Sequence, residues 1–177
     1  GTGYGADNET QRAKQRTKVS KALAKINADL YGFVEIEQGQ SALAEIAADL
    51  SSNTGRRFSY INDGGSAYGS YTKSGFVYCS DILEPYGALR ENNTGVKERK
   101  KTQAFREKKT GETFLFCVNH FKAKSGSGSG ANADQGDGQG KFNADRVKEA
   151  ESVLANYAKD CIFYNDSDIL IMGDLNA

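Results

Sequence analysis

Residues 168–176, with the sequence DILIMGDLN, decide the fold. The apolar run from Ile169 to Met172 is too short for a typical helix and predicts a buried β-strand. Gly173 permits a tight turn after the strand, and Asp174 and Asn176, two positions apart, would project to the same side of an extended chain. A carboxylate can bind a metal ion or orient a water, and an amide can donate to a phosphate oxygen. The stretch therefore predicts a buried strand that ends in reactive side chains.

Two further apolar strands are predicted to end in polar side chains. They cover residues 30–34 and 114–118, and the polar residues that follow them are Glu35 and Glu37 after the first, and Asn119 and His120 after the second. If the three strands are neighbours, these groups share one rim of the sheets. Carboxylate and amide oxygens suit Mg²⁺, Mn²⁺ or Ca²⁺, and an imidazole suits proton transfer near neutral pH.

Each of these clusters also has a purely structural interpretation. Glu35 and Glu37 fit the solvated end of a strand, and His120, the only histidine, fits a hydrogen-bonded structural residue. Zinc is disfavoured because the sequence has no Cys/His cluster. The sequence also contains no Gly-x-Ser-x-Gly elbow, no P-loop and no dinucleotide-binding fingerprint.

The order of predicted elements is mixed α/β. Apolar residues at helical spacing predict helices at 11–28, 41–51 and 143–159. The last of these helices would bury a stripe made of Val147, Ala150, Val153, Leu154 and Tyr157. Strands are expected at 58–61, 75–79, 102–106 and 113–120, with a break at 84–87 and a flexible Gly/Ser-rich loop at 125–140. This order predicts one domain with two sheets packed face to face and helices outside.

The formal net charge is zero, so any contact with nucleic acid must come from a local patch or from a metal. Residues 97–109 (KERKKTQAFREKK) are rich in Lys and Arg and fit either a phosphate-tracking surface or, as we favour, a solvated hairpin edge. The three cysteines have no metal-like spacing; Cys79 and Cys117 lie in apolar runs and are expected to be buried free thiols, with a single disulfide as the alternative. No apolar run approaches the roughly 20 residues that span a bilayer, so no membrane partner is expected.

The sequence motifs resemble those of the endonuclease/exonuclease/phosphatase superfamily. Residues 173–176 (GDLN) resemble its Gly-Asp-Phe-Asn signature, Val34-Glu35 its Leu-Gln-Glu metal motif, and residues 118–121 (VNHF) its Asn-Thr-His-Leu motif. A narrower group, the predicted extracellular bacterial nucleases, is similar over residues 15–18, 28–37, 118–124 and 135–140, and over Asn143 and Arg146. The resemblance runs in order along almost the whole chain.

The resemblance implies a four-layered αββα sandwich that hydrolyses phosphodiester bonds. Glu35 would then bind the catalytic Mg²⁺ or Mn²⁺ ion, with Ca²⁺ as a further candidate, and Glu37 would lie behind it. His120, Asp174 and Asn176 would be the catalytic residues: His120 at the scissile phosphate, Asp174 on the attacking water and Asn176 on a phosphate oxygen. The predicted phosphate- or substrate-binding residues are Arg99 (with Arg106 as the weaker match), Asn119, Asn143 and Arg146.

Two departures from the superfamily pattern predict an incomplete domain over residues 1–177. The superfamily's first strand, which carries a metal-binding Asn, and its last motifs, which carry a second catalytic His, have no match in this sequence. We therefore expect a partial sandwich with exposed apolar sheet faces, completed by a missing C-terminal segment or by a swapped homo-oligomer. The narrower resemblance also implies a secreted or periplasmic protein.

Three functions remain open from the sequence. The first is an extracellular nuclease that cleaves DNA or RNA by attack of water on phosphorus. The second keeps the fold but acts on phosphomonoesters or phospholipid head groups, and the segment at 137–140 (DGQG) argues against it. The third is a truncated, non-catalytic domain that binds nucleic acid or a partner through residues 97–109, and it predicts salt-sensitive binding without metal.

Overall fold

The computed structural model of the chain describes residues 6–36, 40–63, 73–92 and 100–177. Its helices are α1 (Glu9–Ile26), α2 (Gln40–Thr54) and α3 (Asn143–Tyr164), with a 3₁₀ turn, η1 (Gly130–Asn132). Its strands are β1 (Leu30–Ile36), β2 (Phe58–Tyr60), β3 (Lys73–Cys79), β4 (Leu83–Asn92), β5 (Lys100–Glu107), β6 (Thr113–His120) and β7 (Ile169–Asp174).

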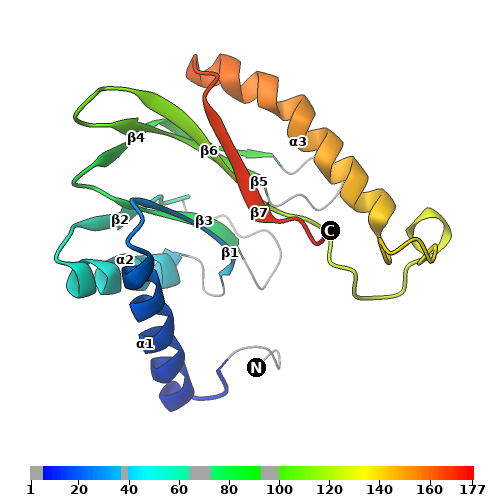
Figure 1. Cartoon of the computed structure of the whole chain (residues 1–177), viewed down its shortest axis with the longest axis horizontal. Helices are drawn as coiled ribbons and strands as arrows, with labels where there is room; N and C mark the ends of the chain where they lie inside the picture. The colour runs from blue at the N-terminus through cyan, green and yellow to red at the C-terminus, as the bar shows by residue number, and fades with distance from the viewer. Residues whose placement is uncertain (1–5, 37–39, 64–72, 93–99) are drawn as a thin grey trace.

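The strands form two sheets that are stacked between helices (Figure 1). Sheet A has the order β1-β3-β2, and sheet B has the order β4-β5-β6-β7. All neighbouring strands are antiparallel except β6 and β7, which are parallel and are connected through α3. Helices α1 and α2 cover the outer face of sheet A and α3 covers sheet B, so the predicted four-layered αββα architecture is confirmed.

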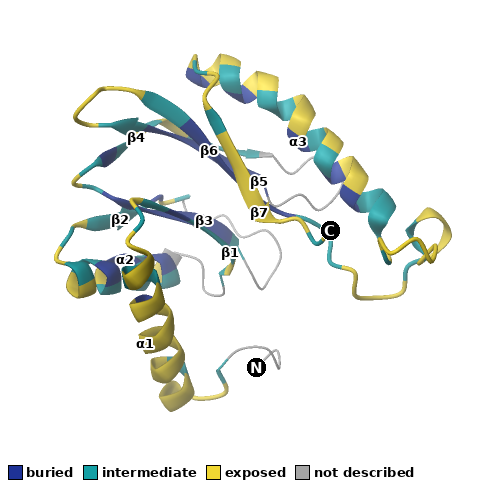
Figure 2. Ribbon diagram, in the orientation of Figure 1, coloured by how far each residue is buried: buried dark blue, intermediate teal, exposed yellow. Residues whose placement is uncertain are grey.

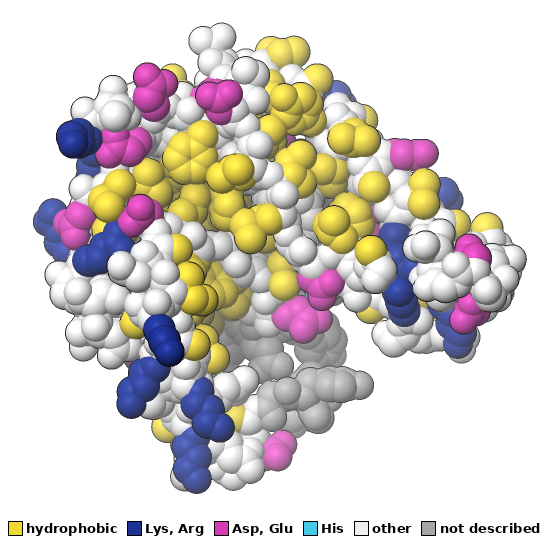
Figure 3. Space-filling view, in the orientation of Figure 1, with side chains coloured by type: hydrophobic (Ala, Val, Ile, Leu, Met, Phe, Trp, Pro, Cys, Tyr) yellow, Lys and Arg dark blue, Asp and Glu magenta, His cyan; other side chains and the backbone are white. Residues whose placement is uncertain are grey.

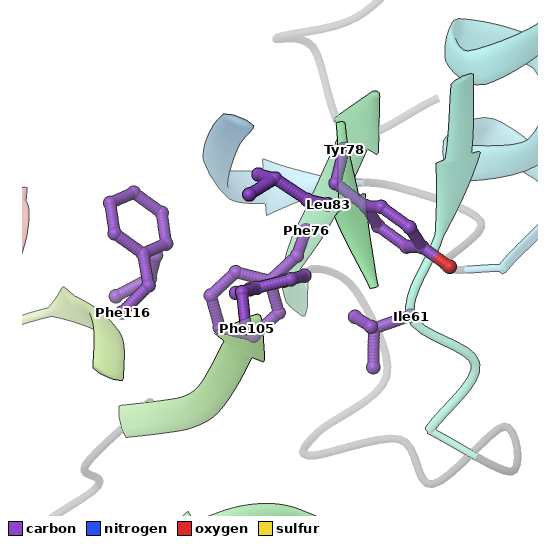
Figure 4. Close-up of a cluster of buried hydrophobic side chains, with 7 residues drawn as sticks. Ile61, Phe76, Tyr78, Leu83, Phe105 and Phe116 are labelled. Carbon is purple, nitrogen blue, oxygen red and sulfur yellow. The ribbon is translucent and has the colours of Figure 1, made fainter. Parts of the chain in front are cut away.

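The core between the sheets is built mainly from aromatic rings. Phe76 and Tyr78 of β3 meet Phe105 of β5 and Phe116 of β6, with ring centroids 5.4–6.3 Å apart (Figure 4). A second core lies under α2, where Leu43, Ala47 and Leu50 of the predicted apolar stripe are buried. Burial of these side chains stabilises the stacking of the four layers.

Helix α3 buries a different face from the one that its apolar residues predict. Val147 and Leu154 are 48% and 67% exposed, whereas the buried residues at this helix are Arg146, Glu149, Val153, Asp160 and Tyr164. These positions recur at helical spacing and so form one continuous face. The prediction was right for Val153 and wrong for Val147 and Leu154, because charged residues can occupy a buried face when partners elsewhere in the fold satisfy them.

The Lys/Arg-rich segment divides into two parts: Lys108 and Lys109 are exposed in the β5–β6 hairpin, as we favoured, but the start of β5 is buried. Lys100 and Lys101 begin β5 and are only 3% and 5% exposed. Lys100 donates to Asp160 at 2.6 Å, and Lys101 pairs with Asp63 at 2.5 Å and with Glu91 at 3.0 Å. Neither lysine is solvated or available to track phosphates, while residues 97–99 lie outside the described part of the chain.

Strand β7 is the main correction to the predicted core. The sequence predicts a buried strand, but Leu170, Ile171 and Met172 are 58%, 44% and 46% exposed (Figure 2). The strand lies at the edge of sheet B and pairs with β6 alone, so its second edge has no neighbour among the described strands. Hydrophobic side chains accordingly gather on this face of the molecule (Figure 3). The expectation of exposed apolar sheet surface is therefore confirmed.

Smaller differences concern turns and loops. The predicted break at 84–87 lies inside β4, where the register shifts between Tyr86 and Arg90 and Gly87 takes φ +71°. Residues 125–140 form the expected surface loop, which contains the short turn η1 and is tied by a hydrogen bond from Lys141 Nζ to the Gly126 carbonyl. All three cysteines are free, as expected. Within the described residues no helix is long and apolar enough to cross a membrane.

Candidate active site

The three predicted strand ends meet at one rim of the sandwich. His120, the last residue of β6, stands opposite Asp174, the last residue of β7, in the parallel register. His120 Nε2 lies 3.6 Å from Glu35 Oε1, a residue of the other sheet. A carboxylate of one sheet therefore lies near an imidazole of the other, and the backbone register places a second carboxylate residue beside that imidazole.

A bulge in β1 aims Glu35 at this rim. The register with β3 shifts between Phe33 and Ile36, and Glu35 adopts φ +57°. Side chains other than Gly rarely take this left-handed conformation, and bulges often re-aim a side chain next to a functional site. The Glu35 side chain is 66% exposed, so its carboxylate is open to a ligand.

Gly173 brings the end of β7 against β6. It has φ +144°, and an added Cβ would lie 1.8 Å from the carbonyl oxygen of Asn119. Only glycine permits this approach of the two backbones. The close approach sets Asp174 directly beside His120.

The chain turns immediately after β7. Asn176 has φ +51°, and its backbone N–H donates to Asp174 Oδ1 at 3.0 Å, so residues 174–176 do not form the extended chain that the spacing predicts. The Asn176 side-chain amide donates to the Phe121 carbonyl at 3.0 Å. An amide nitrogen carries two N–H groups, so this bond orients Asn176 and leaves one donor for a ligand.

His120 and Asn119 lie on opposite faces of β6. His120 follows Phe116 and Val118 on the face that packs on sheet A, and it is 7% exposed. Asn119 is 1% exposed, and its amide donates to the Met172 carbonyl at 3.2 Å. Asn119 thus joins β6 to β7 beneath the rim, and its predicted contact with phosphate remains a prediction.

The two predicted residues of α3 also lie beside the rim. Arg146 is 5% exposed, and its guanidinium donates to the carbonyls of Gln139 at 2.6 Å, Lys141 at 2.8 Å and Lys122 at 3.4 Å. In the described part of the chain, the guanidinium of Arg146 therefore binds backbone carbonyl groups. Asn143 is the first residue of α3, where the helix dipole favours anions, although Asn132 Oδ1 already accepts the N–H of Asp145 there.

Sequence reasoning missed Glu149, which lies one turn after Arg146. Glu149 is fully buried, and its Oε2 accepts the N–H of Lys122 at 2.7 Å. The spacing of Arg146, Glu149, Val153 and Asp160 is the sequence signal that could have found it, since these residues share one face of the helix.

A second polar cluster lies deeper, between α3 and β5. The Asp160 carboxylate is 2% exposed and accepts from Arg90 Nε, Lys100 Nζ and Thr102 Oγ1 at 2.6–2.8 Å. Burial acts to raise the pKa of Asp160, but the hydrogen bonds from Lys100, Arg90 and Thr102 bring it below its ordinary value. On β6, burial raises the pKa of the Cys117 thiol, so this cysteine stays protonated.

A divalent cation fits only part of the donor set in the described residues. Glu35 and Asp174 offer hard carboxylate oxygens, which Mg²⁺ and Mn²⁺ prefer. No group of three or more His, Cys, Asp or Glu side chains is preassembled in the described ranges. Mg²⁺ usually keeps several waters and needs one or two carboxylates, so Glu35 suits such an ion. Glu37 and Arg99 lie outside the described residues.

Comparison with known proteins identifies the fold. No family model and no curated protein matches the sequence. An endonuclease/exonuclease/phosphatase family protein from Bacteroides thetaiotaomicron matches with 16% identity and a TM-score of 0.62, over 97% of this chain and 60% of its own. The mannosyl-6-phosphatase of the same bacterium matches with 15% identity and a TM-score of 0.61, over 97% and 62%.

The catalytic domain of human Nocturnin, with bound sulfate, matches with 13% identity and a TM-score of 0.60, over 93% of this chain and 57% of its own. The chain therefore spans about three fifths of the solved structures to which it is similar. At these identities the likeness concerns the fold alone. The described chain has the architecture of part of an endonuclease/exonuclease/phosphatase domain.

Proposed function

We propose that this protein is a metal-dependent phosphodiester hydrolase that cleaves nucleic acid, and that it acts outside the cell or in the periplasm. The observation that carries the proposal is the meeting of Glu35, His120 and Asp174 at one rim. The relatives in fold include proteins described as phosphatases and as an endonuclease/exonuclease/phosphatase family protein, which supports phosphate ester chemistry.

Each residue of the rim has a separate task in the proposed reaction. Glu35 holds the divalent ion, Mg²⁺ or Mn²⁺, which when bound supplies positive charge to the phosphate. Asp174 orients the attacking water through its exposed carboxylate, whose Oδ1 the N–H of Asn176 already fixes. The hydrolysis breaks one P–O bond and forms another, with water as the nucleophile.

His120 and Asn176 stabilise charge on the phosphate as it becomes more negative. Asn176 uses the amide N–H that Phe121 does not take, and His120 offers its imidazole from the same rim. Preorganised donors of this kind are worth about 10²–10³-fold each in rate when they point at the developing charge. Arg99 and Asn143 are proposed to line the path of the substrate, as the resemblance implies.

A phosphomonoesterase or phospholipid phosphodiesterase is the second candidate. The fold comparison favours it to the extent that one similar structure is a mannosyl-6-phosphatase and another is the 2′,3′-cyclic phosphatase ANGEL2. The rim chemistry is the same for both substrates, since both need a cation, a water and donors to phosphate oxygen. The substrate must therefore be decided by experiment.

Plasmid cleavage tests the proposal directly. The purified chain is incubated with supercoiled DNA and Mg²⁺ or Mn²⁺, beside an EDTA control and the variant Asp174→Ala. We expect nicking that EDTA abolishes and that Asp174→Ala lowers by about 100-fold or more. Release of phosphate from inositol phosphates or mannose 6-phosphate, without cleavage of DNA, would replace the nuclease by the second candidate.

Because the fold is partial, the same experiment also tests what completes the site. We propose that a further segment, or a second copy of the chain in a swapped homo-oligomer, completes the site, because β7 exposes apolar side chains at an unpaired edge of the described sheet. The molar mass of the active species is therefore measured in the same samples. Metal-independent, salt-sensitive DNA binding that survives Asp174→Ala would instead support a non-catalytic binding domain.

A further inference from the structure

The backbone that follows His120 is held from two sides. Phe121 is bound by the end of β7: its N–H donates to the Asp174 carbonyl at 2.9 Å, and its carbonyl accepts from Asn176 Nδ2 at 3.0 Å. Its neighbour Lys122 is bound by α3 instead, with N–H to Glu149 and carbonyl to Arg146. The N–H and the carbonyl group of Phe121 and of Lys122 are therefore all hydrogen-bonded.

The two α3 residues are unusual choices for such a task. Glu149 is fully buried and Arg146 is 5% exposed, and a buried charge is costly unless it is hydrogen-bonded. At 2.7 Å the bond from the Lys122 N–H to Glu149 Oε2 lies at the short end of the range for N–H···O hydrogen bonds. A neutral side chain would fill the same space without this requirement, which indicates that the directed bond itself matters.

The same pair also connects the loop to the site. Arg146 binds the carbonyls of Gln139 and Lys141, so it ties the end of the loop to the position of Lys122. From Lys122 the connection continues through Phe121 to Asp174 and Asn176. A shift of Lys122 would therefore move His120 relative to the carboxylate opposite.

We propose that Glu149 and Arg146 are positioning residues, which fix the Lys122 backbone and thereby hold His120 against Asp174 and Asn176. Neither residue contacts the substrate in this proposal. Its predicted effect on rate rests on the proposed hydrolase function. Its predicted effect on the position of His120 does not, because that effect concerns only contacts within the chain. A misplacement of about 1 Å in a reacting group can lower the rate by roughly 100-fold.

Three variants separate positioning from general stability. Glu149→Ala removes the acceptor for the Lys122 N–H, and Glu149→Gln restores a neutral acceptor of the same shape. Val153→Ala, one turn further along the buried face of α3, is the matched control, since Val153 is 5% exposed and its truncation lowers stability through lost packing. All variants are assayed at a temperature where each is folded.

The rate readout is metal-dependent DNA cleavage with separate kcat and KM. We expect Glu149→Ala to lower kcat by roughly 10- to 100-fold with little change in KM, and Glu149→Gln to recover most of it. Val153→Ala should keep its kcat. Equal rates for Glu149→Ala and Val153→Ala would overturn the proposal.

The second readout does not need activity. His120 is the only histidine, so the Cε1–H signal of its ring stands alone among imidazole Cε1–H signals in a ¹H–¹³C NMR spectrum at fixed pH. We expect this signal and the Lys122 amide signal to move in Glu149→Ala and to return toward the wild-type position in Glu149→Gln. An unmoved His120 signal would overturn the proposal, whereas absent cleavage by the wild type would sink only the hydrolase function.

Discussion

Strands β6 and β7 are neighbours with similar apolar sequences and opposite surroundings. Leu115, Cys117 and Val118 of β6 are at most 1% exposed, whereas Leu170, Ile171 and Met172 of β7 are at least 44% exposed. The two strands run in register, with Phe116 opposite Leu170 and Val118 opposite Met172. The difference therefore comes from what surrounds each strand and not from its own residues.

The comparison shows what an apolar run can and cannot predict. Strand β6 has β5 and β7 on its sides, sheet A on one face and the end of α3 on the other. Strand β7 has β6 on one side, and none of the described strands pairs with its other edge. Its apolar sequence would suit a buried strand, but the described residues leave its side chains exposed. Its C-terminal end nevertheless reaches the candidate site, because the register with β6 alone places Asp174 beside His120.

The largest expected effect comes from truncating matched leucines on the two strands. Leu115→Ala should lower the free energy of unfolding by about 2–5 kcal/mol, because Leu115 is fully buried. Leu170→Ala should lower it by less than about 1 kcal/mol, because Leu170 is 58% exposed. Urea denaturation measures both. Equal losses would mean that a partner covers β7 in solution.

The next effect concerns the charge that α3 buries behind β5. Asp160→Asn should lower the free energy of unfolding at pH 7 by about 3 kcal/mol, since Lys100 would keep its charge without its carboxylate. The pKa of Asp160 is lowered in the folded state, so its contribution is present above the unfolded pKa and is lost as the pH falls through the folded one.

The direction of this pKa shift allows a pH test of the pair formed by Asp160 and Lys100. The difference in stability between wild type and Asp160→Asn should stay constant above about pH 5 and shrink below about pH 4. Denaturation curves recorded from pH 7 to pH 3 measure it. A difference that persisted at the acid end would show that Asp160 stabilises the fold by packing and not by charge.

A third, smaller effect is expected where the two strands approach most closely. Gly173→Ala should cost about 1–3 kcal/mol, because alanine is strained at φ +144° and its Cβ would overlap the Asn119 carbonyl. The strand ends would separate, so cleavage should fall much further than stability. Gly111→Ala is the control, since Gly111 also has positive φ but no atom within 4 Å. Similar loss of cleavage in both variants would argue against a role for the close approach.

The smallest effect on stability is expected from charging the exposed strand. Leu170→Lys with Met172→Lys should change the free energy of unfolding by no more than about 0.5 kcal/mol, since both side chains are already well exposed. Lysines on an edge strand hinder pairing with another chain, so any self-association should weaken. Sedimentation measures the association. An unchanged oligomer would place the contact between copies elsewhere.

The sequence predicted the site more completely than the surroundings of the site. The ends of three apolar strands were predicted to share a rim, and the structure places Glu35 3.6 Å from His120 and Asp174 opposite His120 in the register, while the roles of these residues stay predictions. The bulge that turns Glu35 toward His120 could not be predicted, because it depends on pairing with β3. Glu37 and Arg99 remain predictions outside the described residues.

The wrong predictions share one physical cause. Lys100 and Lys101 were expected at a solvated hairpin edge, and Glu149 was missed, because isolated charges avoid the interior. Each is buried beside specific partners that lie far away along the chain, such as Asp160 for Lys100 and Lys122 for Glu149. Periodicity in a single segment contains no information about such partners, so it selects the wrong face of α3.

The parallel pairing of β6 and β7 also determines when the rim can form during folding. The bond between Asn176 and Phe121 joins residues 55 positions apart, and the whole of α3 lies between them. The hairpin of β5 and β6 closes a far shorter loop, so its chain entropy loss is smaller and it can form early. We therefore expect the rim, which needs β7 in register with β6, to assemble later in folding than the β5–β6 hairpin.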